Sequence, residues 1–300
     1  MKIPEFSVII PTYNRAYCIK NAVDSVLNQN YRDFELLVID DNSKDETTTV
    51  LNEYGDSIKS IKLSNNSGNA VARNVGINNS QGKIIVFLDS DDTFEKFYLD
   101  ELYKSAQKNG DFDFFWTGIN LFNNGEFQGK RHWHPTFTQP GLEFFNELRI
   151  GTNFGLAIRS HVLSKTGLFD ESLKASVDRD FLLRISQNFK GFPIPGHFIN
   201  YTLNSSESVR KDKTNQANSY LIMIKKYEEI INSDIRFKKF WYHKTMWICY
   251  YSGMKKEARL MLKKSPLNIK TSLLAIIFEL FPLQQAISIH QCFGNKGFYK

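Results

Sequence analysis

Short, almost uninterrupted apolar runs, separated by segments with helical periodicity, constrain the fold of this chain more than any other feature. Phe6–Ile10 and Phe34–Ile39 are too short for helices and carry few polar residues, as in strands that are buried on both faces. Between them, Ala16–Gln29 places its apolar residues on one helical face. The alternation continues with strands predicted at Ser57–Leu63 and Lys83–Leu88 and helices predicted at Asn69–Asn78 and 95–109. The chain is therefore predicted to adopt an α/β fold, in which helices cover both faces of a mostly parallel central sheet.

Local signals add detail to this outline. Ser43–Glu46 has the pattern of a capping box, which predicts that a second helix opens there. A strand at Phe112–Trp116 is followed by a predicted hairpin turn at Asn123–Gly125. From about residue 215 the sequence is wholly helical, and Lys213–Asn218 is the expected hinge. We therefore divide the chain into an α/β domain over residues 1–210 and a helical region over 211–300.

Polar side chains follow three of the predicted strands at the point where each strand ends. They are Pro11–Asn14 after the first strand, Asp40–Ser43 after the second and Asp89–Asp92 after the fourth. In an open parallel sheet, ligands bind beyond the carboxyl ends of the strands. If the three strands are neighbours, the three clusters meet in one cleft, and that cleft is the expected binding site.

A cleft with four or more carboxylates requires a cation, because the carboxylates would otherwise repel one another. Mg²⁺ and Mn²⁺ accept carboxylate oxygens, and typically take one or two from protein and the rest from phosphate and water. Asp89 and Asp91 are two residues apart, which places both side chains on the same side of an extended segment. Charge balance therefore predicts a divalent metal that Asp91 shares with a diphosphate. The alternative, a turn or helix N-cap, suits Asp92 and Thr93 better than Asp89.

The net charge of +6 hides a strong asymmetry along the chain. Residues 1–209 contain 21 Lys and Arg against 26 Asp and Glu, whereas residues 210–300 contain 17 against 6. Such a basic segment suits peripheral contact with anionic lipid through residues 215–290, contact with a partner or a second copy of the chain, or plain packing between helices. Lysine pairs beside aromatic and leucine-rich turns favour the lipid surface. Nucleic acid is not expected as a partner, because no reader motif is present.

Membrane-spanning and disulfide-rich classes are excluded. The longest apolar stretch, Ser272–Phe281, is about half the length of a membrane span. Met1–Phe6 lacks the apolar core of an export signal. Cys18, Cys249 and Cys292 form no CxxC pair, so neither a disulfide framework nor a structural zinc site is indicated. We therefore expect a protein of the reducing cytosol, with any membrane contact being peripheral and on the inner face of the cytoplasmic membrane.

Four segments carry a resemblance to a known family. They are Ser7–Arg15 (SVIIPTYNR), Phe34–Ser43 (FELLVIDDNS), Gly68–Gly76 (GNAVARNVG) and Val86–Asp92 (VFLDSDD). In this order and spacing they make residues 5–205 similar to family 2 glycosyltransferases, which are inverting enzymes of the GT-A fold. The resemblance implies a Rossmann-like GT-A domain, with a nucleotide-sugar half over about 1–95 and an acceptor half over about 96–210.

The resemblance also implies how a nucleotide would be held. Pro11, Thr12 and Tyr13 would wall the base, and Tyr13 offers a ring face for stacking. Asp41 would accept the uracil imino proton. Two alternatives stay open here: Tyr13 as a core residue, and Asp40 as a residue that stabilises the turn after its strand.

Further residues are carried over in the same way. Arg73 would lie near the base or the diphosphate, Asp89 would contact the ribose, and Asp91, together with Asp89, would ligate Mn²⁺ or Mg²⁺. The resemblance also places Asn14, Asn69 and Ser90 among the residues that bind the nucleotide sugar.

A second group of segments resembles the acceptor side of the same family. Gly151–Ser160 and Thr166–Leu173 lead to Ser176–Arg184, which aligns Asp178 with the family's catalytic base. That carboxylate would take the proton of an attacking sugar hydroxyl. Asp178 could instead be a first-turn acid favoured by the helix dipole, and Asp180 is the alternative base.

The chain departs from the family's pattern at two places. Val177 stands where the family often has Glu. Ile199–Ser208 keeps Tyr201 but lacks the Arg and His of the family's Tyr-Arg-x-His segment, so no histidine ligand is assigned. Asn204 as a weak ligand, or Arg210 near the diphosphate, is the alternative.

The loop His132–His134 invites interpretation as a metal site. Two histidines without a third ligand are more typical of an exposed loop. Trp133 in this loop could stack on an acceptor sugar, whereas Trp116 is expected in the core.

The resemblance implies a metal-dependent hexosyltransferase that uses UDP-hexose or UDP-N-acetylhexosamine. The acceptor would be a saccharide or lipid-linked saccharide in surface polysaccharide synthesis. One alternative is a catalytically inactive GT-A-fold protein that binds carbohydrate or acts as a scaffold. Another is a nucleotidyltransferase, which needs a glycine-rich basic loop where this chain has Pro11–Asn14.

Overall fold

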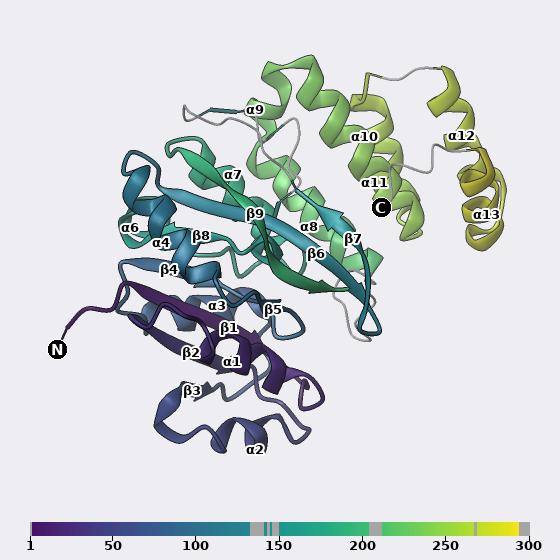
Figure 1. Ribbon diagram of the computed structural model, residues 1–300. Helices are drawn as coiled ribbons and strands as arrows, with labels where there is room; N and C mark the ends of the chain where they lie inside the picture. The colour runs from purple at the N-terminus through teal and green to yellow at the C-terminus, as the bar shows by residue number, and fades with distance from the viewer. Residues whose placement is uncertain are drawn as a thin grey trace. The chain divides into compact units, whose positions relative to one another are not determined.

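The computed structural model describes residues 2–132, 141–142, 145, 150–203, 212–266 and 269–293. Contacts divide the chain into unit 1, residues 1–172 with 177–208, and unit 2, residues 173–176 with 209–300. The strands of unit 1 are β1 (Phe6–Thr12), β2 (Phe34–Asp40), β3 (Lys59–Lys62), β4 (Ile84–Phe87), β5 (Thr93–Phe94), β6 (Phe114–Asn123), β7 (Glu126–Arg131), β8 (Ala157–Arg159) and β9 (Gly191–Thr202) (Figure 1). Its helices are α1 (Ile19–Leu27), α2 (Thr47–Asn52), α3 (Asn69–Asn78), α4 (Tyr98–Lys108), α6 (Ser160–Thr166) and α7 (Val177–Ser186), with 3₁₀ turns η1 (Gly55–Ser57) and η2 (Thr152–Phe154).

The strands of unit 1 form one sheet in the order β3-β2-β1-β4-β8-β6-β9-β5, with β7 paired to β6. The first half, β3 to β4, is parallel throughout, as the alternation of apolar runs and helices predicts. In the second half, β8 runs antiparallel to both β4 and β6, while β9 is parallel to β6. The strand β8 therefore joins a parallel half to a mixed half within one sheet.

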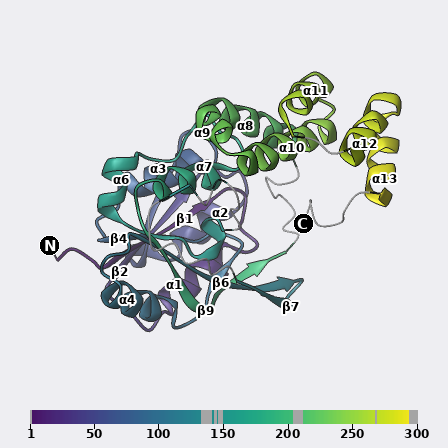
Figure 2. The ribbon, with the colours of Figure 1, turned by 90° about the horizontal axis from the view of Figure 1, so that it is seen from above.

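Helices cover both faces of this sheet. Figure 2 shows α3, α6 and α7 on one side and α1 and α4 on the other. The helix α3 lies directly on β1, because a Cβ added at Gly76 would be 2.5 Å from Ile9 Cγ2. Ile9, Val38 and Val86, from three neighbouring strands, are fully buried. A core of this kind explains why the strand sequences are continuously apolar rather than alternating.

Two local predictions are confirmed. The hairpin between β6 and β7 turns at Asn124 and Gly125, whose φ angles of 50° and 82° are the left-handed values of a type I′ turn. Trp116 is fully buried in β6, as expected of a core residue.

The predicted capping box at Ser43–Glu46 is wrong. The helix α2 begins at Thr47, and no side chain caps it at Glu46. Ser43 instead donates its backbone N–H to Asp40 Oδ1 at 2.8 Å, which closes the turn after β2. Asp45 Oδ1 accepts from Thr47 N at 3.0 Å and from Thr47 Oγ1 at 2.6 Å. The pattern failed because the carboxylates of Asp40 and Asp45 take the bonds that a capping box would make.

The described part of unit 2 is helical, as predicted. It contains α8 (Lys213–Lys226), α9 (Glu228–Ser233), α10 (Ile235–Tyr251), α11 (Lys255–Lys264), α12 (Ile269–Leu280) and α13 (Leu283–Phe293). The hinge predicted at 213–218 is wrong, because these residues form the first turns of α8. Trp241, Tyr242 and Tyr250 of α10 are almost fully buried and form much of the core of this unit. None of the described helices combines the length and the hydropathy needed to cross a bilayer.

Candidate active site

The three polar clusters predicted at strand ends lie at one edge of the sheet. The strand β1 is hydrogen-bonded to β2 on one side and to β4 on the other, and all three run in the same direction. Thr12 at the end of β1 is the register partner of Asp40 at the end of β2. Tyr13 and Asp41 follow these strands directly, and Asp89 lies two residues after the end of β4. The three strands are therefore neighbours, as the prediction requires, and the meeting of the three clusters in one cleft stays a prediction.

The adjacent carboxylates after β2 have different partners. Asp40 is fully buried, and its Oδ2 accepts from Thr48 Oγ1 at 2.8 Å, with Lys62 Nζ at 3.8 Å. Together with its bond to Ser43 N, these contacts make Asp40 the residue that stabilises the turn. Asp41 instead accepts the backbone N–H groups of Ser67 and Gly68, one on each oxygen and each at 2.7 Å. Both bonds fix the Asp41 carboxylate at the N-terminus of α3.

The segment after β1 is tied to the segment after β2 by Asn14. Asn14 N donates to Ser43 Oγ at 2.9 Å, and Asn14 Oδ1 accepts from Lys44 N at 2.8 Å. Asn14 and Asn42 have φ angles of 50° and 63°, in the left-handed region that costs a non-glycine residue energy. Strained backbone of this kind clusters at binding sites. Two such residues therefore flank the loops that carry Tyr13 and Asp41.

The nucleotide-binding residues predicted at the ends of β1 and β4 differ in exposure. Pro11, Thr12 and Ser90 are buried, and Tyr13 is half-buried, while Asn69 at the start of α3 is exposed. Thr12 Oγ1 is buried without a hydrogen-bond partner. A buried hydroxyl without a partner is costly unless a ligand or water supplies one, so Thr12 is a candidate contact for a bound group.

Arg73 connects the loop after β4 to the 3₁₀ turn η2. Its Nη2 donates to Asp89 Oδ1 at 2.8 Å and to Thr152 Oγ1 at 3.1 Å. The guanidinium also lies 5.6 Å from the ring centroid of Phe169. Arg73 is 5% exposed, and its Nε is buried without a hydrogen-bond partner. The sequence placed Arg73 in the site, but gave no role to Thr152, which lies 79 residues further along the chain.

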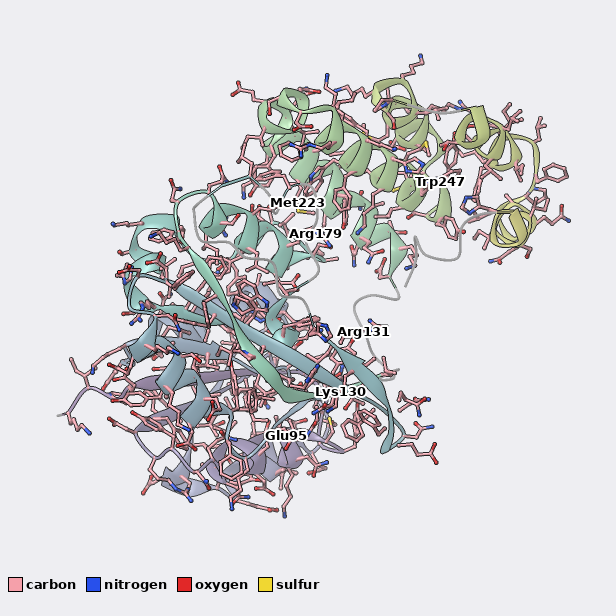
Figure 3. The ribbon with its side chains drawn as sticks, turned by 45° about the horizontal axis from the view of Figure 1, so that its top comes forward. Glu95, Lys130, Arg131, Arg179, Met223 and Trp247 are labelled. Atoms are coloured by element: carbon pink, nitrogen blue, oxygen red, sulfur yellow. The ribbon has the colours of Figure 1, made fainter. Side chains whose placement is uncertain are left out.

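Asp178 lies in the first turn of α7, beside the same segment. Its Oδ1 accepts from Arg179 N at 3.0 Å, and Arg179 is labelled on α7 in Figure 3. A Cβ added at Gly151 would be 2.0 Å from Asp178 Oδ2, so the carboxylate lies against the Gly151 backbone. Because Gly151 precedes Thr152, Asp178 and the Arg73–Asp89 pair are brought together by two consecutive residues.

Asp180, the alternative base, has a structural role. It is fully buried, and its Oδ2 accepts from Arg184 Nε at 3.0 Å. Arg184 Nη1 and Nη2 donate to the carbonyl oxygens of Thr166 and Leu168, each at 2.6 Å. A carboxylate buried in this network is poorly placed to receive a proton from a substrate, which favours Asp178 over Asp180.

The acidic segment after β4 is divided between a buried and an accessible carboxylate. Asp92 is 1% exposed, and its Oδ1 accepts from Thr202 N at 2.8 Å, which ties this loop to β9. Asp91 is half-exposed. Burial, reinforced by the negative charge of Asp91, raises the pKa of the Cys18 thiol to about 11. Cys18 Sγ lies 3.5 Å from Ser90 O, so Cys18 is a neutral neighbour of the acidic loop.

The donor atoms of this loop fit a divalent cation that is shared with a ligand. Within the described ranges, no group of three or more His, Cys, Asp or Glu could hold a metal ion alone. Asp89 and Asp91 offer the one or two carboxylates that Mg²⁺ or Mn²⁺ takes when phosphate and water complete its shell. His132 is exposed, with its ring 5.6 Å from that of His197. Trp133, His134, Asn204 and Arg210 lie outside the described residues.

Sequence comparisons agree with this geometry. A family model described as glycosyl transferase family 2 matches residues 7–171. The uncharacterized glycosyltransferase RP339 of Rickettsia prowazekii is 28% identical over 269 residues, covering 87% of this chain and 76% of that protein. WfgD of Escherichia coli, named as a UDP-Glc:alpha-D-GlcNAc-diphosphoundecaprenol beta-1,3-glucosyltransferase, is 34% identical over 183 residues, covering 60% of this chain and 68% of that protein. Three other relatives are matched over 33–42% of their own length.

Two solved structures share the fold. Staphylococcus aureus TarS 1–349 in complex with UDP-GlcNAc has a TM-score of 0.64 and 20% identity, with 94% of this chain and 81% of that chain covered. The mannosyltransferase PcManGT of Pyrobaculum calidifontis, in complex with GDP-Man and Mn²⁺, has a TM-score of 0.55 and 14% identity, with 98% and 85% covered. At identities this low, the two structures support conclusions about the fold alone. Their similarity confirms the predicted α/β class with its helical C-terminal region.

Proposed function

The chain belongs to glycosyl transferase family 2, and from that membership we propose that it transfers a hexose-type sugar from a nucleoside diphosphate donor, with inversion at the anomeric carbon. The donor we propose is UDP-hexose or UDP-N-acetylhexosamine. WfgD uses a UDP-sugar according to its name, and TarS was solved with UDP-GlcNAc. The sites of the donor and of the catalytic base are our assignment to this chain.

One observation carries the proposal: a nucleotide-side pair and a candidate base meet at the same two residues. Arg73 Nη2 binds both Asp89 and Thr152, and the Asp178 carboxylate lies against Gly151. A transferase needs this proximity, since the base and the leaving group must act on the same sugar carbon. An inactive scaffold would have no such need.

The donor's nucleotide would lie at the ends of β1 and β2. We assign the base contacts to Tyr13, by ring stacking, and to Asp41, whose carboxylate is held rigid by two backbone N–H groups and keeps further lone pairs for a donor. Arg73 would face the diphosphate, because a guanidinium is suited to binding phosphate oxygens. The same pocket would also include Asn14, Asn69 and Ser90.

A divalent cation belongs to the proposal. Asp91, with Asp89, would hold Mn²⁺ or Mg²⁺ together with the diphosphate oxygens. When bound, the ion supplies positive charge beside the leaving diphosphate. The carboxylates fit this role because Asp91 is accessible and Asp89 is oriented by Arg73 at 2.8 Å.

Asp178 is the proposed general base. Inversion is a single displacement, in which an acceptor hydroxyl attacks the anomeric carbon while the bond to the diphosphate breaks. Asp178 would take the hydroxyl proton as the new bond between the acceptor oxygen and the anomeric carbon forms. It lies in the first turn of α7, where the helix dipole favours negative charge.

We propose that the acceptor is a saccharide on a lipid carrier, as the name of WfgD indicates for that enzyme. Such an acceptor is confined to a membrane surface, so the enzyme would work at the inner face of the cytoplasmic membrane. The basic sequence of unit 2 supports peripheral attachment there. The product would enter a bacterial surface polysaccharide.

A panel of nucleoside diphosphate sugars tests the proposal. Released nucleoside diphosphate is measured with Mn²⁺ or with EDTA, and with or without an extract of lipid-linked saccharides. We expect turnover of a UDP-sugar that requires metal and increases with the extract. Release of pyrophosphate from a nucleoside triphosphate would indicate a nucleotidyltransferase instead. Carbohydrate binding without turnover of any donor would indicate the inactive scaffold.

A further inference from the structure

We propose that Gly151 and Thr152 are positioning residues for the transfer, because they set the Asp178 carboxylate relative to the Arg73–Asp89 pair. This inference rests on the proposed function, since it assumes that Asp178 is the base and that Arg73 and Asp89 face the donor. It adds two residues to which neither motif spacing nor resemblance gave a role.

Thr152 determines where the Arg73 guanidinium lies. Arg73 Nη2 carries two N–H groups, and Asp89 Oδ1 and Thr152 Oγ1 accept them at 2.8 and 3.1 Å. Thr152 is 3% exposed, so water cannot easily replace its hydroxyl. Without that hydroxyl, Nη2 of Arg73 keeps its bond to Asp89 but loses the one to Thr152, and Asp89 is the residue proposed to contact the donor.

Gly151 determines where the Asp178 carboxylate lies. Its φ of −156° is extended backbone that any residue adopts, so the requirement for glycine here is steric. A Cβ would be 2.0 Å from Asp178 Oδ2 and 3.0 Å from Asn153 Oδ1. The closest obstructing atom is the tip of a side chain, so an alanine would be accommodated by turning the carboxylate away. The fold would survive while the base moved.

The segment Gly151–Gly155 is also anchored at its C-terminal end, which fixes its position in the fold. The 3₁₀ turn η2 ends at Gly155, whose φ is 59°. Tyr98, which is fully buried, donates its hydroxyl to Gly155 O. Consecutive Cα atoms are about 3.8 Å apart. The residue that contacts the proposed base, Gly151, and the residue that contacts Arg73, Thr152, are therefore neighbours in one anchored segment.

The first test is Gly151→Ala, compared with Gly110→Ala. Gly110 is an exposed glycine with open space around its Cβ position, and is a matched control for the same substitution. We expect Gly151→Ala to lower kcat about 100-fold, to change the donor KM by less than about two-fold, and Gly110→Ala to match wild type. Wild-type kcat in Gly151→Ala, or a KM increase that accounts for the lost activity, would overturn the role of Gly151.

A double variant distinguishes an effect of Gly151→Ala on the Asp178 carboxylate from an effect on the fold. In an Asp178→Asn background the base is already absent, so we expect Gly151→Ala to lower the residual turnover by less than about two-fold. A further 100-fold loss in that background would show that the alanine acts on the fold and would overturn the proposal.

The second test compares Thr152→Val with Thr152→Ser. Valine keeps the shape of threonine but removes the hydroxyl, whereas serine keeps it. We expect Thr152→Val to raise the donor KM about 10-fold, and Thr152→Ser to restore it to within about two-fold of wild type. Equal donor KM values for the two variants would show that the Thr152 hydroxyl has no part in donor binding.

Failure of this inference and failure of the proposed function are distinguishable. If wild type releases no nucleoside diphosphate from any donor, the proposed function fails and these variants carry no information on it. If wild type is active and Gly151→Ala and Thr152→Val behave like wild type, the function stands and the positioning role is wrong.

Discussion

Carboxylates that are close in sequence have different surroundings here, and the surroundings separate their roles. Asp178 is half-exposed, and its Oδ1 accepts from Arg179 N at 3.0 Å. Asp180, two residues later, is fully buried and bonded to Arg184. A carboxylate can serve as a base only if a substrate hydroxyl reaches it. The same contrast distinguishes accessible Asp91 from buried Asp92 in the loop after β4.

Asp178→Asn is therefore expected to lower the transfer rate to a small residual turnover while leaving UDP affinity within about two-fold of wild type. Asn has nearly the same shape but cannot take a proton, and loss of a general base typically costs 10²–10⁴-fold in rate, roughly. The rate is measured as nucleoside diphosphate release, and affinity by calorimetric titration with UDP. Asp111→Asn, at an exposed position after α4, is the matched control. Equal activity of Asp178→Asn and wild type would remove Asp178 from the mechanism.

Asp91→Ala is expected to weaken UDP binding only when metal is present. Removal of an accessible metal ligand should lower UDP affinity at least about 10-fold in Mn²⁺, with little change in EDTA. The measurement is a UDP titration of both proteins under both conditions. An equal loss in EDTA would mean that Asp91 contacts the nucleotide without a metal, and no loss in Mn²⁺ would exclude it as a ligand.

Motif residues could be predicted from the sequence because each follows its strand immediately. The clusters that contain Asp41 and Asp89 were found in this way, since the ends of parallel strands are where ligands bind in such sheets. The roles proposed for the two residues came from the family resemblance. Thr152 could not be found so, because its partner Arg73 is 79 residues away and only the folded chain brings them together. The sequence offered one signal for Thr152: it is a small polar residue in the run Gly151–Asn153, which precedes a buried strand.

At the scale of elements, α7 is held to the preceding segment by one ionic network. Arg184 joins Asp180 on its own helix to the carbonyl oxygens of Thr166 and Leu168, at the end of α6 and just beyond it. The position of α7 sets the position of Asp178 in its first turn. One acid of α7, Asp180, thus has a structural role, and another acid of the same helix, Asp178, is the proposed base.

Asp180→Ala is expected to destabilise unit 1 by about 3 kcal/mol, because it leaves Arg184 partly buried without its carboxylate. The figure is at the low end of the usual range, since the Arg184 side chain keeps 17% exposure. In a thermal scan this corresponds to a fall in Tm of roughly 6–12 °C. Asp178→Asn, in the same helix turn, should leave Tm within about 2 °C. A Tm for Asp180→Ala equal to wild type would contradict the network's role.

In unit 2, a half-buried histidine, His243, makes the helix packing sensitive to acid. Burial, with smaller contributions from the charges of Lys239 and His290, lowers the pKa of His243 below its usual 6.5. Trp247 Nε1 donates to His243 Nε2 at 3.0 Å, a bond that requires the neutral ring. Burial also lowers the pKa of His290, whose Nδ1 is 2.9 Å from Tyr251 OH. Both rings are therefore more easily protonated in the unfolded chain.

The sign of the pH effect follows. The stabilisation of the folded state by the neutral rings of His243 and His290 is fully present above the pKa of about 6.5 of an unfolded histidine. It is lost as the pH falls from 6.5 through the lowered pKa values of the two residues in the folded state. We expect calorimetry to show a midpoint for unit 2 lower by about 2–4 °C at pH 5.5 than at pH 7.5. His243→Gln should reduce this difference, whereas His161→Gln in unit 1 should not. A midpoint that rises on acidification would refute the assignment.

Elements were predicted best where strand and helix patterns were local. The helix predicted at Asn69–Asn78 has those bounds in the structure, and it packs on β1, where Gly76 lies against Ile9. The short antiparallel β8 was not predicted as such, since three residues carry no periodicity and its pairing with β4 and β6 is set by the tertiary fold. The predicted start of α2 was wrong for a local reason: Asp40 and Asp45, which precede the helix, take the bonds that the capping box would make.

At the scale of the whole molecule, charge and apolar surface are unevenly distributed. Unit 2 holds most of the basic excess, and α12 carries exposed apolar side chains at spacings of three and four residues. The exposed fractions are 59% for Leu273, 49% for Ile276, 73% for Leu280 and 41% for Phe281. Apolar residues beside lysines are the chemistry of attachment to anionic lipid headgroups. An acceptor on a lipid carrier would make such attachment useful.

The full chain is therefore expected to bind vesicles that contain anionic lipid, and less so at high salt, because screening weakens the lysine contribution. Ile276→Asp with Leu280→Asp should weaken binding at least about 10-fold, since each aliphatic side chain contributes roughly 1.5–3 kcal/mol when buried. Ile3→Asp with Phe127→Asp is the matched control: both residues are exposed, by 58% and 55%, and both lie in unit 1. Co-sedimentation with vesicles measures all three proteins. Equal binding by the two double variants would exclude α12 as the attachment face, and equal binding to neutral vesicles would exclude the electrostatic contribution.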